Sequence, residues 1–242
     1  MLTRNKIVAQ KGFNLIELMV ALTLGLLLLA AVSQIYVNTT GSSHNTLKMA
    51  RVNQELRAAM DVMVRDIQRA GYYNQATATG TGAVAGAANP FMQGANNLAI
   101  SGSCITYTYD RDNNTTVDDT EKMAFYLSND AILMRNGGSA ASNSCTPTSE
   151  GITDSNRVTI TALDFALTTH CINTSVALSG PNVDNCTAIT PTAGDVLIKP
   201  RQVTITITGK PKEDSSGEMQ RTITDTVHLR NHMVCIAGAA PC

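Results

Sequence analysis

Residues 13–37 form a long apolar run that contains one charged residue, Glu17. From Leu18 to Val32 no side chain carries a charge. At about 1.5 Å per residue the run extends roughly 37 Å as a helix, more than the hydrocarbon core of a bilayer at about 30 Å. The sequence therefore predicts that residues 13–37 hold the chain in a membrane.

Glu17 does not fit an ordinary membrane segment. An ionised carboxylate inside a membrane helix costs on the order of a few kcal/mol unless it is paired or lies near the interface. A cleaved secretory signal has an apolar core followed by small residues, which Ala30-Ala31-Val32-Ser33 imitates. A secretory signal and a plain single-span anchor remain alternatives, but neither accounts for the acid.

The stretch Lys11-Gly12-Phe13, followed by Glu17 and the apolar run, resembles the class III signal of type IV prepilins and pseudopilins. The resemblance implies that a prepilin peptidase removes residues 1–12 as a leader, cutting between Gly12 and Phe13, and N-methylates Phe13. It also implies an assembly role for Glu17. Its carboxylate can neutralise the new α-ammonium of a neighbouring subunit, because burying either charge alone is costly.

The basic residues of the leader, Arg4, Lys6 and Lys11, predict the orientation of the chain. Positive charge stays on the cytoplasmic side, so the C-terminal part is expected in the periplasm. Without these three residues the chain holds 15 Lys and Arg against 19 Asp and Glu. A mildly acidic chain lacks the basic surface of a nucleic-acid-binding protein, so no direct nucleic-acid binding is predicted.

Residues 38–72 carry an amphipathic helical pattern. Opposite charges four residues apart form three candidate ion pairs, Arg51–Glu55, Arg57–Asp61 and Asp61–Arg65. Gly71 offers a C-terminal cap and no proline precedes residue 90, so residues 13–70 are expected to form one long helix or two nearly collinear helices. Apolar residues every three or four positions give one stripe: Met49, Val52, Leu56, Ala59, Met63, Ile67 and Ala70.

Residues 73–97, rich in Ala, Gly, Thr and Asn, are expected to be a loop. Residues 98–242 show strand periodicity, with hairpin turns at 128–130 and 209–218. One long helix followed only by strands predicts an α+β fold, in which the helix packs on an antiparallel β head domain. Strands are expected at 98–100, 105–109, 123–127, 131–135, 157–160, 163–167, 202–208 and 221–229.

Two further stretches, Arg65–Tyr72 and Leu229-Arg230-Asn231, resemble PilW-type minor pilins. The resemblance implies the pilin fold and a subunit of a type IV pilus, near its tip. There it would help initiate assembly with other minor pilins and the major pilin on the inner-membrane assembly platform, for adhesion, twitching motility or DNA uptake. Gln34 stands where major pilins usually carry a helix-kinking proline, which argues against an abundant shaft subunit.

The expected location follows from this resemblance. The chain would cross the inner membrane once, with its head in the periplasm, and would be part of an extracellular pilus afterwards. A J-type pseudopilin of a type II secretion system and a membrane-anchored periplasmic binding domain remain alternatives.

Six cysteines lie beyond the apolar run. An even number in an oxidising compartment predicts disulfides, and the sequence leaves their connectivity open. Sequential pairing is preferred here: Cys104–Cys145, Cys171–Cys186 and Cys235–Cys242. No close C-x-x-C pair indicates a zinc site.

One loop has the spacing of calcium ligands. Asp110, Asp112, Asn114 and Glu121 occupy ligand positions of an EF-type loop, but Thr115 replaces the glycine that such a loop requires, and the flanks are strands. The loop is therefore not an EF-hand. A plain hydrophilic loop is preferred, and a calcium-stabilised loop is the alternative.

No other cofactor and no enzymatic activity are predicted. His228 and His232 lie at or near a strand end, where a spacing of four residues does not bring side chains together. The sequence has no Gly-x-Ser-x-Gly nucleophile elbow, phosphate-binding loop or dinucleotide fingerprint.

Overall fold

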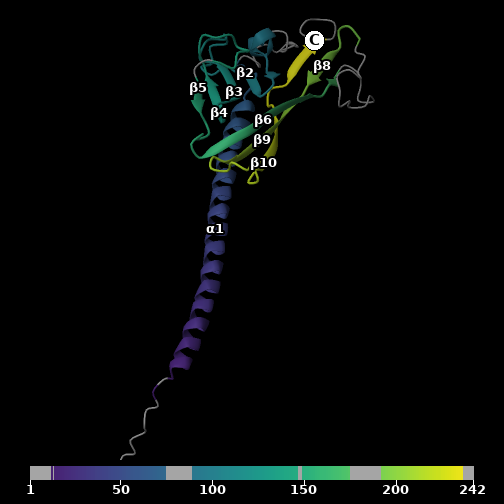
Figure 1. Cartoon of the computed structure of the whole chain (residues 1–242). Helices are drawn as coiled ribbons and strands as arrows, with labels where there is room; N and C mark the ends of the chain where they lie inside the picture. Colours follow the sequence, from purple (N-terminus) through teal and green to yellow (C-terminus); the bar gives the residue numbers. More distant parts are fainter. Residues whose placement is uncertain (1–11, 13, 75–88, 147–148, 175–191, 237–242) are drawn as a thin grey trace, which may run out of the picture. The chain divides into compact units, whose positions relative to one another are not determined.

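The computed structural model describes residues 12, 14–74, 89–146, 149–174 and 192–236 (Figure 1). In these residues one long helix, α1 (Leu15–Ile67), precedes a series of antiparallel strands. This is the predicted α+β architecture, and it agrees with a pilin fold. The chain divides into two compact units, residues 1–48 and 49–242, and α1 contributes to both.

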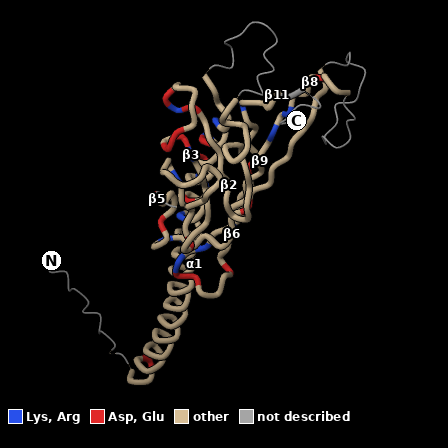
Figure 2. The backbone as a smooth tube through the Cα atoms, turned by 90° about the horizontal axis from the view of Figure 1, so that it is seen from above, with Lys and Arg blue, Asp and Glu red and all other residues tan. Residues whose placement is uncertain are grey.

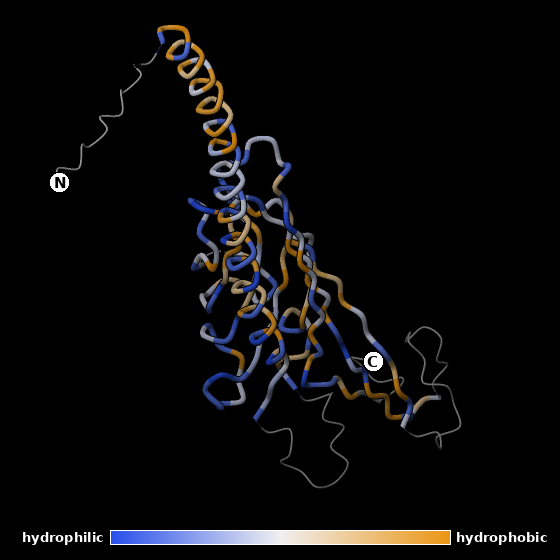
Figure 3. The backbone as a smooth tube through the Cα atoms, turned by 90° about the horizontal axis from the view of Figure 1, so that it is seen from below, coloured by the Kyte–Doolittle hydropathy of each residue, from blue (hydrophilic) through white to orange (hydrophobic). Residues whose placement is uncertain are grey.

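In the first unit, α1 carries the apolar run. Its large apolar side chains are exposed, as in Leu27, which is 68% exposed. Figure 3 shows this part of the helix as almost uniformly hydrophobic, and Figure 2 shows it almost without charge. The segment is long and apolar enough to cross a membrane, and none of its apolar window is buried within the protein.

The polar stretch after the apolar run continues the helix. The hydroxyls of Thr40, Ser43 and Thr46 donate hydrogen bonds at 2.8 to 2.9 Å to backbone carbonyls four residues earlier. These bonds satisfy the hydroxyls inside the helical path, so residues 38–46 do not interrupt α1. The prediction of one long helix is confirmed, with its end at Ile67.

In the second unit, α1 buries the predicted stripe. Val52, Leu56, Ala59, Met63 and Ile67 are each at most 1% exposed. Of the predicted ion pairs the structure forms Asp61–Arg65, at 2.7 Å. Glu55 instead accepts a hydrogen bond from the backbone N–H of Asp154 at 2.8 Å, which attaches the helix to the connection between two strands.

The strands form three antiparallel sheets, where one sheet was predicted. Five strands pair in chain order: β1 (Ala99–Ser101), β2 (Cys104–Thr108), β3 (Lys122–Ser128), β4 (Ala131–Asn136) and β5 (Ser149–Gly151). A second sheet has the order β10 (Arg221–His228), β9 (Arg201–Pro211), β6 (Val158–Thr169). The third has the order β11 (Met233–Ile236), β8 (Val196–Lys199), β7 (Ile172–Asn173).

Both predicted hairpins are present. Asn129 and Asp130 join β3 to β4 with φ angles of 50° and 62°, as a two-residue turn of matching twist requires. Strands β9 and β10 pair over eight residues from Arg221–Gly209 to His228–Gln202. The predicted strands 157–160 and 163–167 are one strand, β6, with a register shift between Ile160 and Ala162.

The prediction of a loop over 73–97 is wrong for its C-terminal part. Two short 3-10 helices, η2 (Pro90–Met92) and η3 (Gly94–Asn96), lie there, and Phe91 and Met92 are buried. The side chain of Asn89 accepts from the backbone N–H of Phe91 at 2.9 Å and thereby starts η2. Residues 75–88 lie outside the described residues.

One hydrophobic core joins α1 to the first two sheets. It contains the helix stripe together with Ile105, Tyr107 and Phe125 of the five-stranded sheet and Leu163 and Ile205 of the second sheet, all buried. At about 25 cal/mol per Å² of apolar area, this burial is the main favourable term for the head.

Candidate functional site

The C-terminal end of α1 is held by the stretch that resembles minor pilins. Gly71 has a φ of 73° and donates its backbone N–H to the carbonyl of Thr108 at 2.8 Å. A Cβ at Gly71 would lie 2.4 Å from Cε of Met92. The left-handed conformation favours glycine here, and the flexible side chain of Met92 occupies the place where a Cβ would lie.

Asp66, in the same stretch, binds two tyrosines of the sheet. The hydroxyl of Tyr107 donates to Asp66 Oδ2 at 2.5 Å, and that of Tyr109 donates to Oδ1 at 3.2 Å. Burial, with the adjacent Asp66 carboxylate, holds the pKa of Tyr107 well above its ordinary value. Sequence reasoning assigned the charges of this stretch only to ion pairs, and it missed the two tyrosines because they lie about forty residues along the chain.

The second family-like stretch meets the first at this helix end. Leu229 is buried, and the backbone N–H of Arg230 donates to the carbonyl of Gln68 at 3.3 Å. The amide of Asn231 donates to the carbonyls of Arg69 and Ala70 at 3.3 and 3.1 Å. Asn231 thus donates to two carbonyls just beyond the end of α1, where the intrahelical partners of such groups run out.

A cavity of about 320 Å³ opens beside this junction, with cationic and amide side chains in its wall. Both family-like stretches and the loop after β2 contribute to it. Its lining residues are Gln68, Arg69, Tyr72, Tyr109, Asp110, Arg111, Asn113, Arg230 and Asn231.

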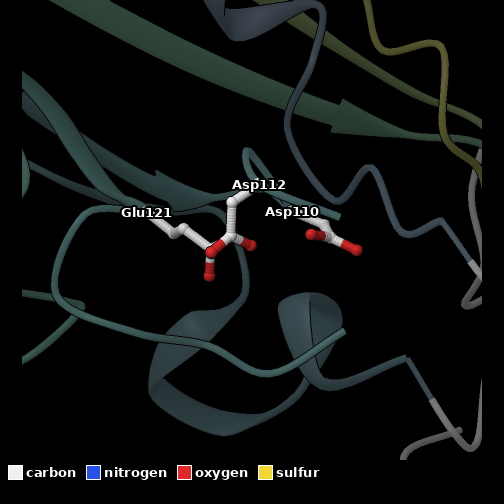
Figure 4. Close-up of side chains that lie close together, drawn as sticks. All are labelled: Asp110, Asp112 and Glu121. Carbon is white, nitrogen blue, oxygen red and sulfur yellow. The ribbon is translucent and has the colours of Figure 1, made fainter. Parts of the chain in front are cut away.

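The loop between β2 and β3 brings three of the four predicted calcium ligands together. One oxygen from each of Asp110, Asp112 and Glu121 lies within 4.8 Å of the other two, and Figure 4 shows their carboxylates side by side. Asn114 uses its side-chain oxygen elsewhere, because Oδ1 accepts the backbone N–H and the hydroxyl of Thr116, both at 2.8 Å.

The turn inside this loop takes the conformation for which an EF-type loop uses glycine. Thr115 has a φ of 69° and Asn113 a φ of 62°. A positive φ is uncommon for a β-branched residue, so the loop adopts the turn at a conformational cost. Thr115 therefore adopts a left-handed φ although it is not glycine.

The two ends of the loop are buried. Asp110 is 2% exposed and Glu121 is fully buried, whereas Asp112 is exposed. Glu121 accepts the backbone N–H of Arg111 at 2.8 Å on Oε1 and that of Asp118 at 3.1 Å on Oε2. Burial raises the pKa of Glu121, and these two hydrogen bonds oppose that shift.

Arg135 is a buried residue that the sequence pattern did not single out. It lies in β4, is 0% exposed, and donates from all three guanidinium nitrogens to five backbone carbonyls. These carbonyls belong to Gly137, Gly138, Ala140, Ala141 and Ser144. Arg135 therefore organises the segment that leads to Cys145.

The Cys104–Cys145 disulfide ties this segment to β2, with its Cα atoms 6.3 Å apart. It is one of the three bonds expected from sequential pairing. Cys171 also belongs to a disulfide. Cys186 and Cys242 lie outside the described residues, and so do the Cys171–Cys186 and Cys235–Cys242 pairings.

The predicted processing segment is described in part. Gly12 is exposed, Phe13 lies outside the described residues, and Glu17 is an exposed residue in the first turn of α1. The backbone N–H of Glu17 donates to the carbonyl of Asn14 at 3.0 Å, and its side-chain carboxylate forms no hydrogen bond or ion pair with another residue in the described part of the chain. An acid in the first turn is favoured by the helix dipole.

Two protein-family models match the chain. Residues 8–33 match the prokaryotic N-terminal methylation motif, which includes Gly12, Phe13 and Glu17. Residues 45–229, more than half of the chain, match prepilin peptidase-dependent protein B. The chain belongs to the prepilin peptidase-dependent protein B family. No curated protein and no solved structure matches it.

Membership in the prepilin peptidase-dependent protein B family establishes the broad class that the sequence suggested. The chain is a pilin-like protein that depends on prepilin peptidase, and its apolar N-terminal helix is of the kind that associates with a membrane. The family match begins in the polar part of α1 and ends at Leu229. It therefore covers the end of α1 and the loop between β2 and β3 (residues 109–121, the acidic loop), and it stops before Arg230 and Asn231. The finer resemblance to PilW-type pilins stays a prediction.

Proposed function

We propose that this chain is a minor pilin that enters a type IV pilus near its tip and helps to initiate assembly. The observation that carries the proposal is the exposed apolar half of α1, whose only charge between residues 15 and 37 is Glu17. The same surface suits lipid before assembly and neighbouring helices afterwards. The proposed role is structural, without catalysis.

The assembly step has a simple electrostatic basis. Cleavage between Gly12 and Phe13 would create an α-ammonium at Phe13, next to the apolar helix. In a bundle of such helices, Glu17 of one subunit would neutralise the α-ammonium of its neighbour, because an unpaired charge in an apolar surrounding is strongly unfavourable. Successive subunits would then add head to tail, which is the open, helical form of heterologous association.

Processing is tested by mass spectrometry of the chain from cells with and without prepilin peptidase. The expected product begins at N-methyl-Phe13, and the enzyme-deficient cells retain residues 1–12. A chain that keeps its leader in both strains, or is cut after Ala31, would contradict the processing step.

The role of Glu17 is tested with Glu17→Ala. The variant is expected to be cleaved and methylated as the wild type is, but its amount in sheared pili should fall at least tenfold, because the α-ammonium of its neighbour stays unpaired. Thr23→Ala is the matched control, since the hydroxyl of Thr23 is already bonded to the carbonyl of Val20 at 2.9 Å. Normal incorporation of Glu17→Ala would refute this assembly mechanism.

Deletion of the gene separates the minor pilin from the J-type pseudopilin. An initiating pilin predicts fewer pili of ordinary length, with adhesion, twitching motility or DNA uptake reduced and protein secretion intact. A pseudopilin predicts reduced protein secretion, with the number of pili and the adhesion, twitching motility and DNA uptake unchanged. Immunogold labelling at pilus ends then tests the tip position.

A further inference from the structure

Three carboxylates of the acidic loop, those of Asp110, Asp112 and Glu121, have no cationic side chain as a partner among the described residues. The guanidinium of Arg111 turns to Asn136 Oδ1 at 2.8 Å, and the ammonium of Lys122 pairs with Asp119 at 2.7 Å. Within the described part of the chain, no Lys or Arg side chain forms a hydrogen bond or ion pair with Asp110, Asp112 or Glu121. Buried carboxylates without such partners are costly, so they imply a charged ligand.

Asp110 supplies an independent sign of that ligand. Its Oδ2 accepts the backbone N–H of Asn74 at 3.2 Å. Its Oδ1 is buried and has no hydrogen-bond partner among the described residues. Figure 4 shows one oxygen of Asp110 directed toward Asp112. A buried oxygen without a partner, next to two further carboxylates, is the arrangement that a metal ion completes.

We infer that Asp110, Asp112 and Glu121 bind a Ca²⁺ ion in the loop between β2 and β3. Ca²⁺ takes six to eight oxygen ligands at about 2.3–2.6 Å in flexible geometry, so oxygens within 4.8 Å of one another fit around one ion. The remaining positions would be filled by water, for which the cavity of about 320 Å³ next to Asp110 gives a path of entry.

The site would link the sheet to the end of α1. Asp110 donates its backbone N–H to the carbonyl of Tyr72 at 2.9 Å, one residue beyond Gly71, which is bonded to Thr108. An ion held between Asp110 and Glu121 would therefore brace the loop against the helix-end junction. Calcium should stabilise the head, and this inference does not depend on the role of the chain in a filament.

The test is calorimetric titration and thermal unfolding of the full-length chain in detergent, with CaCl2 against EGTA. We expect a saturable heat with a Kd of about 0.1–1 mM and a Tm that is about 2 to 6 °C higher in 2 mM CaCl2. Absence of both effects in a folded protein would overturn the inference. An equal Tm increase with MgCl2 would also overturn it, since general charge screening acts alike for both ions.

Three variants locate the site, and two more serve as controls. Asp110→Asn and Glu121→Gln should lose the calcium-dependent Tm shift, and the exposed Asp112→Asn should reduce calcium affinity about tenfold without a folding defect. Asp164→Asn and Glu218→Gln are matched controls, because both side chains are exposed and lie in β6 and in the turn before β10. A calcium shift that survives in Asp110→Asn and Asp112→Asn would place any bound ion elsewhere.

Terbium luminescence reports ion binding directly, independently of any change in the stability of the protein. Tb³⁺ at the site should be sensitised by Tyr109, which directly precedes Asp110, and Ca²⁺ should displace the signal. Asp112→Asn should lower the emission severalfold while Asp164→Asn leaves it unchanged. Emission that is equal in all variants would contradict the assignment.

Discussion

The two halves of α1 use apolar residues in different ways. Between residues 15 and 37 apolar side chains point in every direction and are exposed, whereas between residues 52 and 67 most of the large apolar side chains lie in one buried stripe. A stripe needs only one sheet to cover it, but a helix that is apolar all round needs an apolar surrounding on every side. The second half is therefore stabilised by this chain, and the first half needs an apolar surrounding that the described part of the chain does not provide.

The largest contrast is expected for leucine truncation. Leu56 is 0% exposed in the core, so Leu56→Ala should lower the free energy of unfolding of the head by about 2–5 kcal/mol through lost burial and a cavity. Leu27→Ala, at a position 68% exposed, should change it by less than about 0.5 kcal/mol. The measurement is urea unfolding in detergent followed by tyrosine circular dichroism, because the chain has no Trp. Equal losses of unfolding free energy in the two variants would contradict the difference between the two halves of α1.

Two glycines sharpen the same contrast. Gly71→Ala forces a left-handed conformation on alanine and displaces Met92, so we expect a loss of about 1–3 kcal/mol in the unfolding free energy. Gly25→Ala meets no atom within 4 Å and replaces a helix-interior glycine. It should leave the head unchanged and favour the helix by about 0.5–1 kcal/mol. Urea unfolding and far-UV circular dichroism separate the two effects; a stable Gly71→Ala would show that Met92 and the backbone relax without cost.

Two tyrosines test the polar part of the junction. Tyr107→Phe removes the donor that binds Asp66 at 2.5 Å and leaves a largely buried carboxylate with one fewer partner, a loss of about 1–3 kcal/mol. Tyr36→Phe, at a position 71% exposed in the first half of α1, should have no measurable effect. Thermal unfolding of both variants beside the wild type checks this, and a wild-type Tm for Tyr107→Phe would mean that Tyr109 alone satisfies Asp66.

The parts of the fold that follow from local pattern were predictable. The single helix, its buried stripe and the turn at Asn129–Asp130 each depend on neighbours within a few residues in the sequence. The acidic loop was predictable as a spacing of carboxylates, and the structure adds that two of them are buried. The apolar helix and its end within three residues of Ala70 were predictable, because both depend on contiguous residues.

What could not be predicted depends on distant contacts. Strands β5, β7, β8 and β11 have two to four residues each, too few to show a period of two, and they exist because a neighbouring strand supplies hydrogen bonds. The burial of Arg135 depends on a loop that wraps its carbonyls around the guanidinium. The packing of residues 89–97 depends on Gly71, which lies before a stretch outside the described residues.

The smallest expected difference is in the pH dependence of stability, between a carboxylate of the head, Asp214, and one in the first half of α1, Glu17. Asp214, in the turn between β9 and β10, accepts the hydroxyl of Ser216 at 2.7 Å and the backbone N–H groups of Gly217 and Met219 at 3.1 and 3.0 Å. These bonds, the hydroxyl first, hold the pKa of Asp214 below its ordinary value of 3.8. The unfolded chain therefore binds this proton at higher pH than the folded chain does, so the stabilisation is present above that value and is lost on acidification below it.

Asp214→Asn should therefore lose less Tm between about pH 5 and about pH 2.5 than the wild type does, measured by thermal unfolding in detergent. Glu17→Gln should follow the wild-type profile, because no hydrogen bond or ion pair connects the Glu17 side chain to the rest of the described chain. If Glu17→Gln flattened the profile instead, the acid of the first half would have a partner within this chain. Its proposed pairing with a neighbouring subunit would then lose its physical basis.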